Sequence, residues 1–410
     1  MTTIDYSQIV KCIRCGACQS VCPIFDEKLA ESTVARGKVR LIGGLAKGEV
    51  EPSDRLEELL SFCLSCKACV KSCPSGVATD QLVETARAHL VSHRGLSPLK
   101  KFIFRTLMRN NWLFDFSLKT GSIFQGVALR TSPTGQGKLP RIPLGLDKRR
   151  LVKPLAKKTL RSSYPEIVGK EHKKIVAFYT GCMINYMAPN YGKAVIECLL
   201  KNGCRVIIPK NQQCCGTPAR ANGDKETADL LAQANEYAFK DLSVDTIITG
   251  CASCGLTLKE QTNLAATKEI VDFTEFIVRH DNWKQDLGLV DAMVTYHDPC
   301  HLKRGQGVDA SPREILKAIP GLEYRELQNA DRCCGAAGSF SLRHYDLSKK
   351  INDKKAANIV ATQADWVASA CGSCLMHIED GLARNNSNIK GFHIAEVLAQ
   401  SYKNYGKGVV

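Results

Sequence analysis

Near its start the chain reads Cys12-Ile-Arg-Cys15-Gly-Ala-Cys18-Gln-Ser-Val-Cys22-Pro23. The same spacing returns further on as Cys63-Leu-Ser-Cys66-Lys-Ala-Cys69-Val-Lys-Ser-Cys73-Pro74. Three thiolates on a tight turn can reach three iron atoms of one cluster, and the proline then turns the chain away. A pair of zinc knuckles is the alternative interpretation, which the two intact copies disfavour. The two quartets therefore predict metal clusters.

This spacing is that of two-cluster bacterial ferredoxins, in which the fourth cysteine of each run ligates the other cluster. It predicts two cubane [4Fe–4S] clusters. One cluster is expected to use Cys12, Cys15, Cys18 and Cys73, and the other Cys63, Cys66, Cys69 and Cys22. Between the quartets, Ser53 or Asp54 begins a predicted helix, because a capping residue precedes acidic residues there. We expect residues 1–90 to form a helical ferredoxin domain similar to that of succinate dehydrogenase iron–sulfur subunits.

The length and composition of the chain restrict the class of protein to which these motifs belong. The chain has 410 residues, which indicates two or three domains, and 20 cysteines. The cysteines stand in C-x-x-C and C-C groups, which suit metal ligation better than disulfides. The N-terminal residues lack the pattern of a signal peptide, and no apolar run is long enough for a membrane span. We expect a cytoplasmic protein with reduced thiols.

Residues 91–172 contain no cysteine and are predicted to form a basic connector. Nineteen Lys/Arg but only four Asp/Glu lie between Val91 and Ile175, which accounts for the whole net charge of +15. Within the connector, residues 100–116 interleave basic and large apolar side chains. Two interpretations stay open: contact with an acidic partner or with an anionic membrane at its cytoplasmic face, and packing against the chain's own domains. Nucleic-acid binding is not expected.

From residue 173 onward the pattern is that of an α/β protein. Four short apolar runs lead directly into cysteines and are predicted to be buried parallel strands: residues 175–179, 246–249, 293–296 and 365–369. The cysteine pattern repeats after about 120 residues, which indicates two copies of one domain, 173–290 and 291–410. Each copy offers five candidate metal ligands: Cys182, Cys214, Cys215, Cys251 and Cys254 in the first, and Cys300, Cys333, Cys334, Cys371 and Cys374 in the second.

The adjacent cysteines of each copy indicate which kind of metal site they can form. Neighbouring side chains point in different directions, so a C-C pair suits two separate metal atoms better than one tetrahedral zinc. The glycine that follows each pair lets the backbone approach a bulky cluster. Neither a G-x-G-x-x-G run after a strand nor a Walker A run is found, so nothing predicts NAD, FAD or ATP binding on this chain.

These features resemble the cysteine-rich CCG domain family. Its members include heterodisulfide reductase catalytic subunits, the small subunit of anaerobic glycerol-3-phosphate dehydrogenase, lactate-utilisation proteins and glycolate oxidase iron–sulfur subunits. The whole layout is most similar to the last of these, as is the stretch Ala35-Arg-Gly-Lys-Val-Arg-Leu-Ile42. The resemblance implies an α+β or α/β chain in which a helical two-cluster ferredoxin domain precedes two duplicated Rossmann-like CCG domains.

The resemblance also implies a function. We expect an iron–sulfur electron-transfer subunit of a multi-subunit, flavin-dependent 2-hydroxyacid dehydrogenase of glycolate or lactate type. An FAD-containing flavoprotein partner would oxidise the substrate, and electrons would leave to a quinone pool, an electron-transfer flavoprotein or another carrier. One or two further [4Fe–4S] clusters, cubane or noncubane, would occupy the CCG sets.

Two rival interpretations stay open. Complete five-cysteine sets hold noncubane clusters that cleave disulfides in heterodisulfide reductases, and this chain keeps all ten cysteines. It could therefore be a subunit of that kind with a catalytic noncubane cluster. The third interpretation is a scaffold whose CCG domains bind zinc structurally.

Four further residues lie outside the ligand sets. Cys198, on a predicted amphipathic helix, and Cys204, before a predicted strand, are expected to be buried structural thiols. His297 and His301 flank Cys300 and are expected either to donate a hydrogen bond to a cluster sulfur or to cap local backbone.

Overall fold

The computed structural model describes residues 4–132, 137–141, 147–170 and 174–406, so the Pro/Gly-rich stretch 131–138 lies partly outside the described residues. The chain forms two compact units. Unit 1 comprises residues 1–110, 216–230 and 333–352, and unit 2 comprises residues 111–215, 231–332 and 353–410. The chain leaves unit 1 for unit 2 within α14 (Lys225–Phe239) and again within α20 (Tyr345–Ala361). The domain boundaries expected from the sequence stay predictions.

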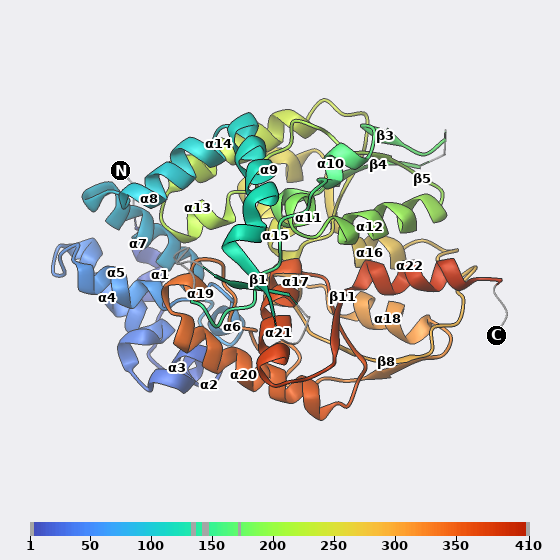
Figure 1. The fold of residues 1–410 in the computed structure, drawn as a ribbon. Coiled ribbons are helices and arrows are strands. Elements are labelled where there is room, and N and C mark those ends of the chain that lie inside the picture. Colours follow the sequence, from blue (N-terminus) through green and yellow to red (C-terminus); the bar gives the residue numbers. More distant parts are fainter. Residues whose placement is uncertain (1–3, 133–136, 142–146, 171–173, 407–410) are drawn as a thin grey trace. The chain divides into compact units, whose positions relative to one another are not determined.

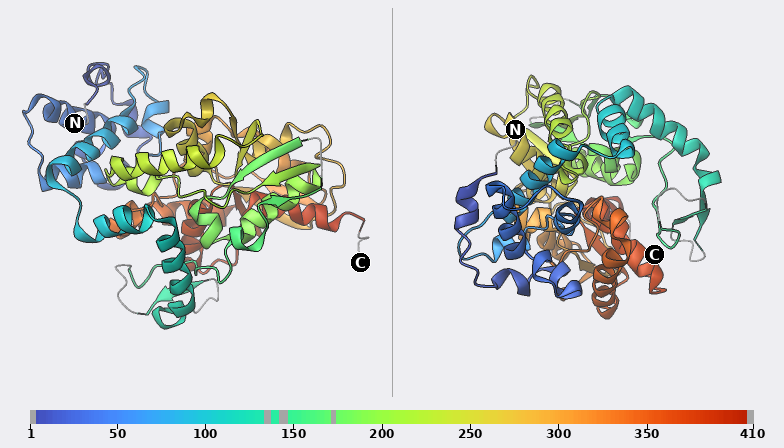
Figure 2. Two further views of the ribbon diagram at one scale, coloured as in Figure 1. Left: turned by 90° about the horizontal axis from the view of Figure 1, so that it is seen from above. Right: turned by 90° about the vertical axis from the view of Figure 1, so that its left-hand side faces the viewer.

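Unit 1 is helical in the residues that the structure describes, with the blue helices of residues 4–94 gathered together (Figure 2). Its core lies between three helices and contains Ile42, Leu60 and Val83, each fully buried. The helical ferredoxin-type fold expected here is confirmed. The helices of this unit are α1 (Tyr6–Val10), α2 (Ala17–Ser20), α3 (Pro23–Lys28), η1 (Glu31–Thr33), α4 (Ala35–Lys47), α5 (Asp54–Ser61), α6 (Ala68–Lys71), α7 (Thr79–Arg94), α8 (Pro98–Lys101), η2 (Phe102–Met108), α13 (Thr217–Ala221) and α19 (Phe340–Arg343).

The start of α5 follows directly from its sequence. Ser53 is the N-cap, and its side chain accepts a hydrogen bond of 3.2 Å from the backbone N–H of Leu56. Asp54 and Glu57 lie in the first turn, where their charges complement the helix dipole. The predicted helix start is therefore confirmed, with Ser53 as the capping residue.

Besides the β1–β2 hairpin, unit 2 contains two larger sheets, and four strands of each follow the same order; Figure 1 labels β3, β4 and β5 of the first sheet and β8 and β11 of the second. The first sheet runs β3-β5-β4-β6-β7 and the second β11-β10-β8-β9. All pairings are parallel except that of β3 with β5. Because β5-β4-β6-β7 matches β9-β8-β10-β11, the duplication is confirmed. The strands are β3 (Ile167–Val168), β4 (Lys174–Tyr179), β5 (Cys204–Ile207), β6 (Thr246–Thr249), β7 (Glu269–Asp272), β8 (Ala292–Tyr296), β9 (Leu322–Arg325), β10 (Trp366–Ser369) and β11 (Lys390–His393).

The helices of unit 2 repeat in the same way. In the first copy they are α11 (Gly181–Tyr186), α12 (Pro189–Lys201), α15 (Ala252–Gln261), η3 (Asn263–Ala266) and α16 (Phe273–Val278). In the second they are α17 (Cys300–Gln306), α18 (Ala310–Ala318), α21 (Gly372–Arg384) and α22 (Ile394–Asn404). Helix α12 packs on α22 and α18 packs on α16, which are equivalent pairs. The two copies therefore meet through a pseudo-twofold interface.

The connector contributes to both units. Helix α8 and the π-helix η2 belong to unit 1, whereas α9 (Asn111–Ala128), the hairpin of β1 (Leu129–Thr131) with β2 (Lys138–Pro140), and α10 (Leu160–Ser163) belong to unit 2. The interleaved stretch 100–116 is therefore not one helix, because the helical structure is interrupted at Asn110. Among the described residues, no helix is both long enough and apolar enough to cross a membrane.

Candidate metal centres

The two cysteine quartets of unit 1 share one local backbone conformation. Arg14 and Ser65 stand at matching positions and both have positive φ, at 58° and 50°. Gly16 and Lys67 match likewise, at 86° and 57°. Left-handed residues on both sides of the second cysteine produce the tight turn on which three thiols can face one cluster.

The structure brings Cys22 to the second quartet. Cys22 caps α3, while Cys69 lies on α6. The pKa of the Cys69 thiol is raised by burial and then by the neighbouring thiols of Cys63, Cys66 and Cys22. Four thiols this close cannot all ionise unless a cation accompanies them. This arrangement supports the crossed ligand set, which itself stays a prediction.

The surroundings of Lys38 indicate whether these thiols suit an anionic cluster. Its side chain lies on α4 and is only 2% exposed. The ammonium donates to the Thr33 carbonyl, and in the described part of the chain no carboxylate forms an ion pair with it. A buried ammonium needs a negative partner. Cys63, Cys22 and Cys69 raise the pKa of Lys38 against the larger lowering by burial, so a cluster with four thiolates fits this place.

Backbone amides approach two sulfur atoms of the second quartet. The N–H of Ser65 donates to Cys63 Sγ at 3.5 Å, and the N–H of Val77 donates to Cys73 Sγ at 3.4 Å. Such bonds favour thiolates, since a donor stabilises the charged form. In the first quartet Cys15 is exposed, whereas Cys12 and Cys18 are half-buried. The quartets therefore differ in how far water reaches them.

The five cysteines of the first C-terminal set lie together in unit 2. Cys182 is on α11 after β4, the pair Cys214–Cys215 follows β5, and Cys251 caps α15, which carries Cys254. The Sγ atoms of Cys182 and Cys214 are 3.8 Å apart. Thiol contacts continue from Cys214 to Cys215, from Cys215 to Cys254 and from Cys254 to Cys251. The structure thus brings all five predicted ligands of this set into one continuous group.

Residues around this set hold its thiols close. Tyr179 ends β4, and its hydroxyl donates to the Gln213 carbonyl at 2.7 Å. Its pKa is raised well above its usual value by burial and then by the thiols of Cys215 and Cys254. The buried amide of Asn235 donates to the Cys214 carbonyl at 3.0 Å. These contacts fix the loop that carries the C-C pair.

Gly181 is needed for the close approach of α11 to α15. Its φ is +60°, and a Cβ there would lie 2.9 Å from Cys254 Sγ. We predict that Gly181→Ala removes about one cluster, roughly four irons. Backbone strain should also lower the free energy of unfolding by about 1–3 kcal/mol. Iron analysis after anaerobic purification, with thermal unfolding, measures both effects.

Gly203→Ala is the matched control for this prediction. Gly203 has a φ of +71°, but a Cβ at this position would meet nothing within 4 Å among the described residues. This variant should carry the backbone strain and keep its iron. A Gly181→Ala protein with a full complement of iron would contradict the assignment of this set.

The second C-terminal set is divided between the units. Cys333 and Cys334 belong to unit 1, and Cys300, Cys371 and Cys374 to unit 2. Within unit 2, the Cys371 thiol contacts both Cys374 and Cys251, and these contacts lower its pKa. The two C-x-x-C motifs therefore touch across the pseudo-twofold interface. Ligation by all five cysteines of this set stays a prediction.

His297 is fully buried beside this set. One ring nitrogen lies within 4.8 Å of Cys374 Sγ. Nδ1 lies 3.0 Å from the Ala330 carbonyl, whereas Nε2 has no hydrogen-bond partner among the described residues. Burial, and then Lys355, lowers the pKa of His297 to about 3, so the ring is neutral. The backbone-bonding role is observed, and the unbonded Nε2 keeps the bond to a cluster sulfur as a prediction.

The remaining candidates make structural contacts. Nδ1 of His301 lies 2.9 Å from the Ser253 hydroxyl. Cys198 and Cys204 are fully buried, and Cys198 Sγ donates to the Ala395 carbonyl at 3.6 Å. Burial raises the pKa of both thiols, which is typical of inert cysteines. Their predicted burial is confirmed.

Sequence reasoning overlooked three residues beside the cysteines. Tyr179 was part of a predicted strand and Asn235 carried no motif. Lys38 offered a usable signal, because it stands on the apolar stripe of α4 between Ala35 and Val39. A lysine at such a position must either be exposed at its tip or find a buried anion.

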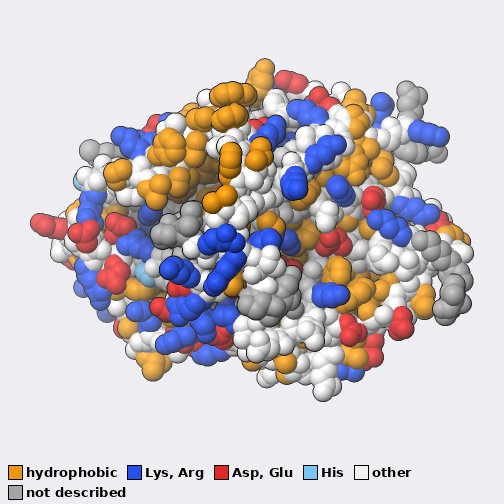
Figure 3. Space-filling model, viewed as in Figure 1, with side chains coloured by type: hydrophobic (Ala, Val, Ile, Leu, Met, Phe, Trp, Pro, Cys, Tyr) orange, Lys and Arg blue, Asp and Glu red, His pale blue; other side chains and the backbone are white. Residues whose placement is uncertain are grey.

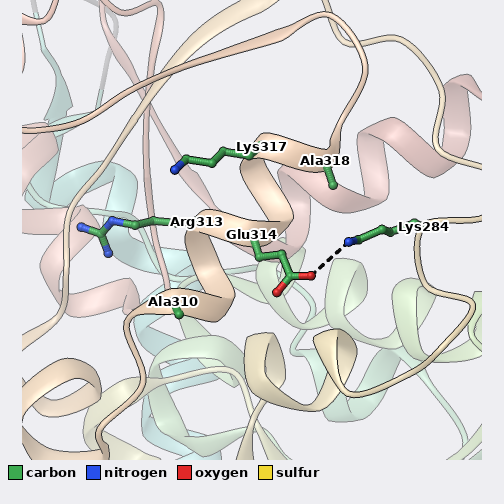
Figure 4. A pocket seen from close by; sticks show the side chains of 6 residues that line it. All are labelled: Lys284, Ala310, Arg313, Glu314, Lys317 and Ala318. Atoms are coloured by element: carbon green, nitrogen blue, oxygen red, sulfur yellow. Dashed lines mark ion pairs between the residues drawn. The ribbon is translucent and has the colours of Figure 1, made fainter.

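A hollow of about 480 Å³ lies elsewhere in unit 2, on α18. Figure 4 shows the side chains that line it, with Lys284 and Glu314 forming an ion pair of 3.1 Å. No cysteine contributes to its lining. It therefore takes no part in the thiol sites.

Two cysteine quartets in a helical unit, together with a duplicated α/β architecture and two C-C-G motifs, define an iron–sulfur protein with several [4Fe–4S] clusters. The family comparisons agree. A 4Fe-4S dicluster domain matches residues 8–77, and a cysteine-rich domain, CCG, matches residues 176–259 and again 294–379.

Whole-chain comparisons then specify the family. The chain is 32% identical to a "probable glycolate oxidase iron-sulfur subunit" of Bacillus subtilis, over 97% of this chain and 95% of that protein. It is 30% identical to a subunit of the fumarate reductase (CoM/CoB) of Methanothermobacter marburgensis, over 97% and 73%. The chain belongs to the CCG-domain iron–sulfur family that contains these subunits. Among solved structures, a hypothetical protein of Helicobacter pylori shares the fold, with 10% identity and a TM-score of 0.51, over 91% of this chain and 69% of that one.

Proposed function

We propose that the chain is the iron–sulfur electron-transfer subunit of a multi-subunit, flavin-dependent 2-hydroxyacid dehydrogenase of glycolate or lactate type. A flavoprotein partner would oxidise the substrate, and the electrons would cross this chain one at a time to a quinone or another carrier. The observation that carries the proposal is the grouping of thiols: the second quartet with Cys22, and the five cysteines of the first CCG set.

The comparisons support the substrate class. Besides the glycolate oxidase subunit, "lactate utilization protein A" of a Geobacillus strain is 34% identical over 54% of this chain and 98% of that protein. Both names refer to small 2-hydroxyacids. The bound clusters would supply one-electron redox chemistry, while this chain's own residues hold the thiols, exclude water and place charge beside them.

Purification from the native host under anaerobic conditions tests this proposal. We expect the chain to co-purify with an FAD-containing subunit and the complex to reduce a quinone analogue in the presence of glycolate or lactate. A chain that purifies without any flavoprotein and is not reduced by either acid would refute it.

A heterodisulfide reductase-like role is the second candidate. The observation in its favour is that all five thiols of the first CCG set are present and in contact. A paramagnetic species formed on adding a disulfide or thiol substrate to the oxidised protein would support it. Its absence, together with reduction by a 2-hydroxyacid, would exclude it.

We also propose that α9 contacts an anionic membrane surface, where a quinone acceptor would be found. Its outer side chains Trp112, Phe116, Ile123, Phe124 and Val127 are between 56% and 76% exposed. Figure 3, which has the view of Figure 1, shows hydrophobic side chains on the face where α9 lies. Residues 111–158 carry ten Lys/Arg and two Asp/Glu, and basic charge beside exposed aromatic residues is typical of interfacial helices.

Helix α9 packs through its other face, so those side chains stay exposed. Phe114 packs edge-on against Tyr186 at 5.4 Å, and Gln125 donates to the Leu155 carbonyl at 2.9 Å. We predict that a Trp112→Ser, Phe116→Ser double variant loses at least about tenfold in its affinity for anionic vesicles, since each aromatic side chain contributes about 1.5–3 kcal/mol on burial.

Co-sedimentation with phosphatidylglycerol vesicles measures this loss. Tyr237→Ser is the control, because Tyr237 is 70% exposed on α14 and lies outside the basic segment. This control should bind like the native chain. Equal binding by all three proteins, or no binding by the native chain, would contradict the membrane contact and leave a protein partner as the occupant of α9.

A further inference from the structure

The buried ammonium of Lys38 interacts unequally with the two ferredoxin-type sites. Its ammonium interacts with the thiols of Cys63, Cys22 and Cys69. These three belong to one predicted ligand set, the one formed by the second quartet and the crossing cysteine. The thiols that act most on Lys38 therefore belong to one predicted ligand set.

Other charges around this site do not cancel Lys38. Arg87 donates to the carbonyls of Leu60, at 2.7 Å, and Cys63, at 2.9 Å, and so adds a second positive charge. The buried carboxylate Asp80 also faces Cys69, but it forms an ion pair of 2.6 Å with Lys67. A surplus of positive charge is left beside these thiols.

The first quartet has a different environment. Of the cations near it, Arg14 is exposed, and Arg36 donates to the Arg14 carbonyl at 3.2 Å. Arg36 is also paired with Glu31, and both side chains are partly exposed, at 29% and 48%. Water and the paired carboxylate weaken its field at Cys15 and Cys18. The structure thus gives the two sites unequal electrostatic surroundings.

We propose that Lys38 raises the reduction potential of the cluster held by Cys63, Cys66, Cys69 and Cys22 above that of the cluster held by Cys12, Cys15, Cys18 and Cys73. Reduction changes the cluster core from 2+ to 1+ by adding one electron, and no bond is made or broken. A nearby buried ammonium stabilises the added negative charge, because the interaction is strong where water is excluded. The electron comes from the flavin of the partner subunit, so the inference rests on the proposed function.

A redox titration of the anaerobically purified, cluster-loaded chain tests this, with dithionite as reductant and electron paramagnetic resonance as the readout. Lys38→Met should lower the potential of one cluster. At a fixed potential the ratio of reduced to oxidised cluster should fall at least tenfold, which corresponds to about 59 mV for one electron. The other cluster should shift much less. Lys38→Arg keeps the charge and should behave like the native chain.

Two further variants make the test decisive. Lys38→Gln removes the charge but keeps a donor for the Thr33 carbonyl, so it must reproduce the shift. Arg36→Gln changes a residue on the same helix. It should shift the potential of the first-quartet cluster by less than Lys38→Met shifts the potential of the cluster held by Cys63, Cys66, Cys69 and Cys22.

Equal shifts of both clusters, an unchanged potential at native iron content, or loss of iron in both neutral variants would overturn the proposal. Because dithionite replaces the partner, these results do not depend on whether a 2-hydroxyacid dehydrogenase partner exists.

Discussion

Replacing Cys22 with serine is expected to destroy the cluster of the second quartet and to spare that of the first, although Cys22 belongs to the first quartet in the sequence. The reason is geometric. The thiol of Cys22 lies among those of Cys63, Cys66 and Cys69. A serine there removes one of four ligands, so iron should fall by up to about four per chain.

Comparison among variants identifies which cluster is lost. The paramagnetic resonance spectrum of reduced Cys22→Ser should match that of Cys63→Ser and differ from that of Cys12→Ser. The spectrum of Cys73→Ser should in turn match that of Cys12→Ser. Cys204→Ala controls for the loss of a buried thiol outside the sets and should keep all its iron. A Cys22→Ser spectrum that matches Cys12→Ser would show that the ligand sets do not cross.

The second large effect is expected from Cys254→Ser. This thiol contacts both Cys215 and Cys251 and lies closest to the position that Gly181 keeps open. Its loss should remove the cluster of the first CCG set, about four irons. Electron transfer from a 2-hydroxyacid to a quinone analogue should fall to background, while both ferredoxin-type signals persist.

Cys198→Ala is the matched control for this variant. Cys198 is buried on α12 in the same copy of the domain and points at the Ala395 carbonyl, away from the set. It should lose some stability but neither iron nor electron transfer. Full activity of Cys254→Ser at reduced iron would mean that the CCG cluster lies outside the electron path.

Features encoded locally could be predicted from the sequence. The quartets need only a turn and a proline, so their spacing alone indicated the clusters. Four strands of unit 2, β4, β6, β8 and β10, are apolar runs that lead into a cysteine, and β6 is buried along its whole length. The duplication followed from the register of Cys182 with Cys300 and of the two C-C-G motifs.

Features that depend on packing could not be predicted. The apolar stripe around Lys38 suggests only that its stem is buried, and the packing of α4 is needed to show that its ammonium lies beside three thiols. The contact between Cys251 and Cys371 requires the pseudo-twofold interface, which no local pattern encodes. The second CCG set is divided between the units at Arg332–Cys333 and again inside α20, which is a continuous helix.

The metal content of the anaerobically purified chain shows whether all four cysteine sets hold [4Fe–4S] clusters, as we propose. Iron and zinc are counted in the same sample, with Cys204→Ala as a reference for intact sites. We expect about 16 irons per chain and no stoichiometric zinc. About 8 irons accompanied by zinc would contradict it, because the CCG sets would then be structural zinc sites.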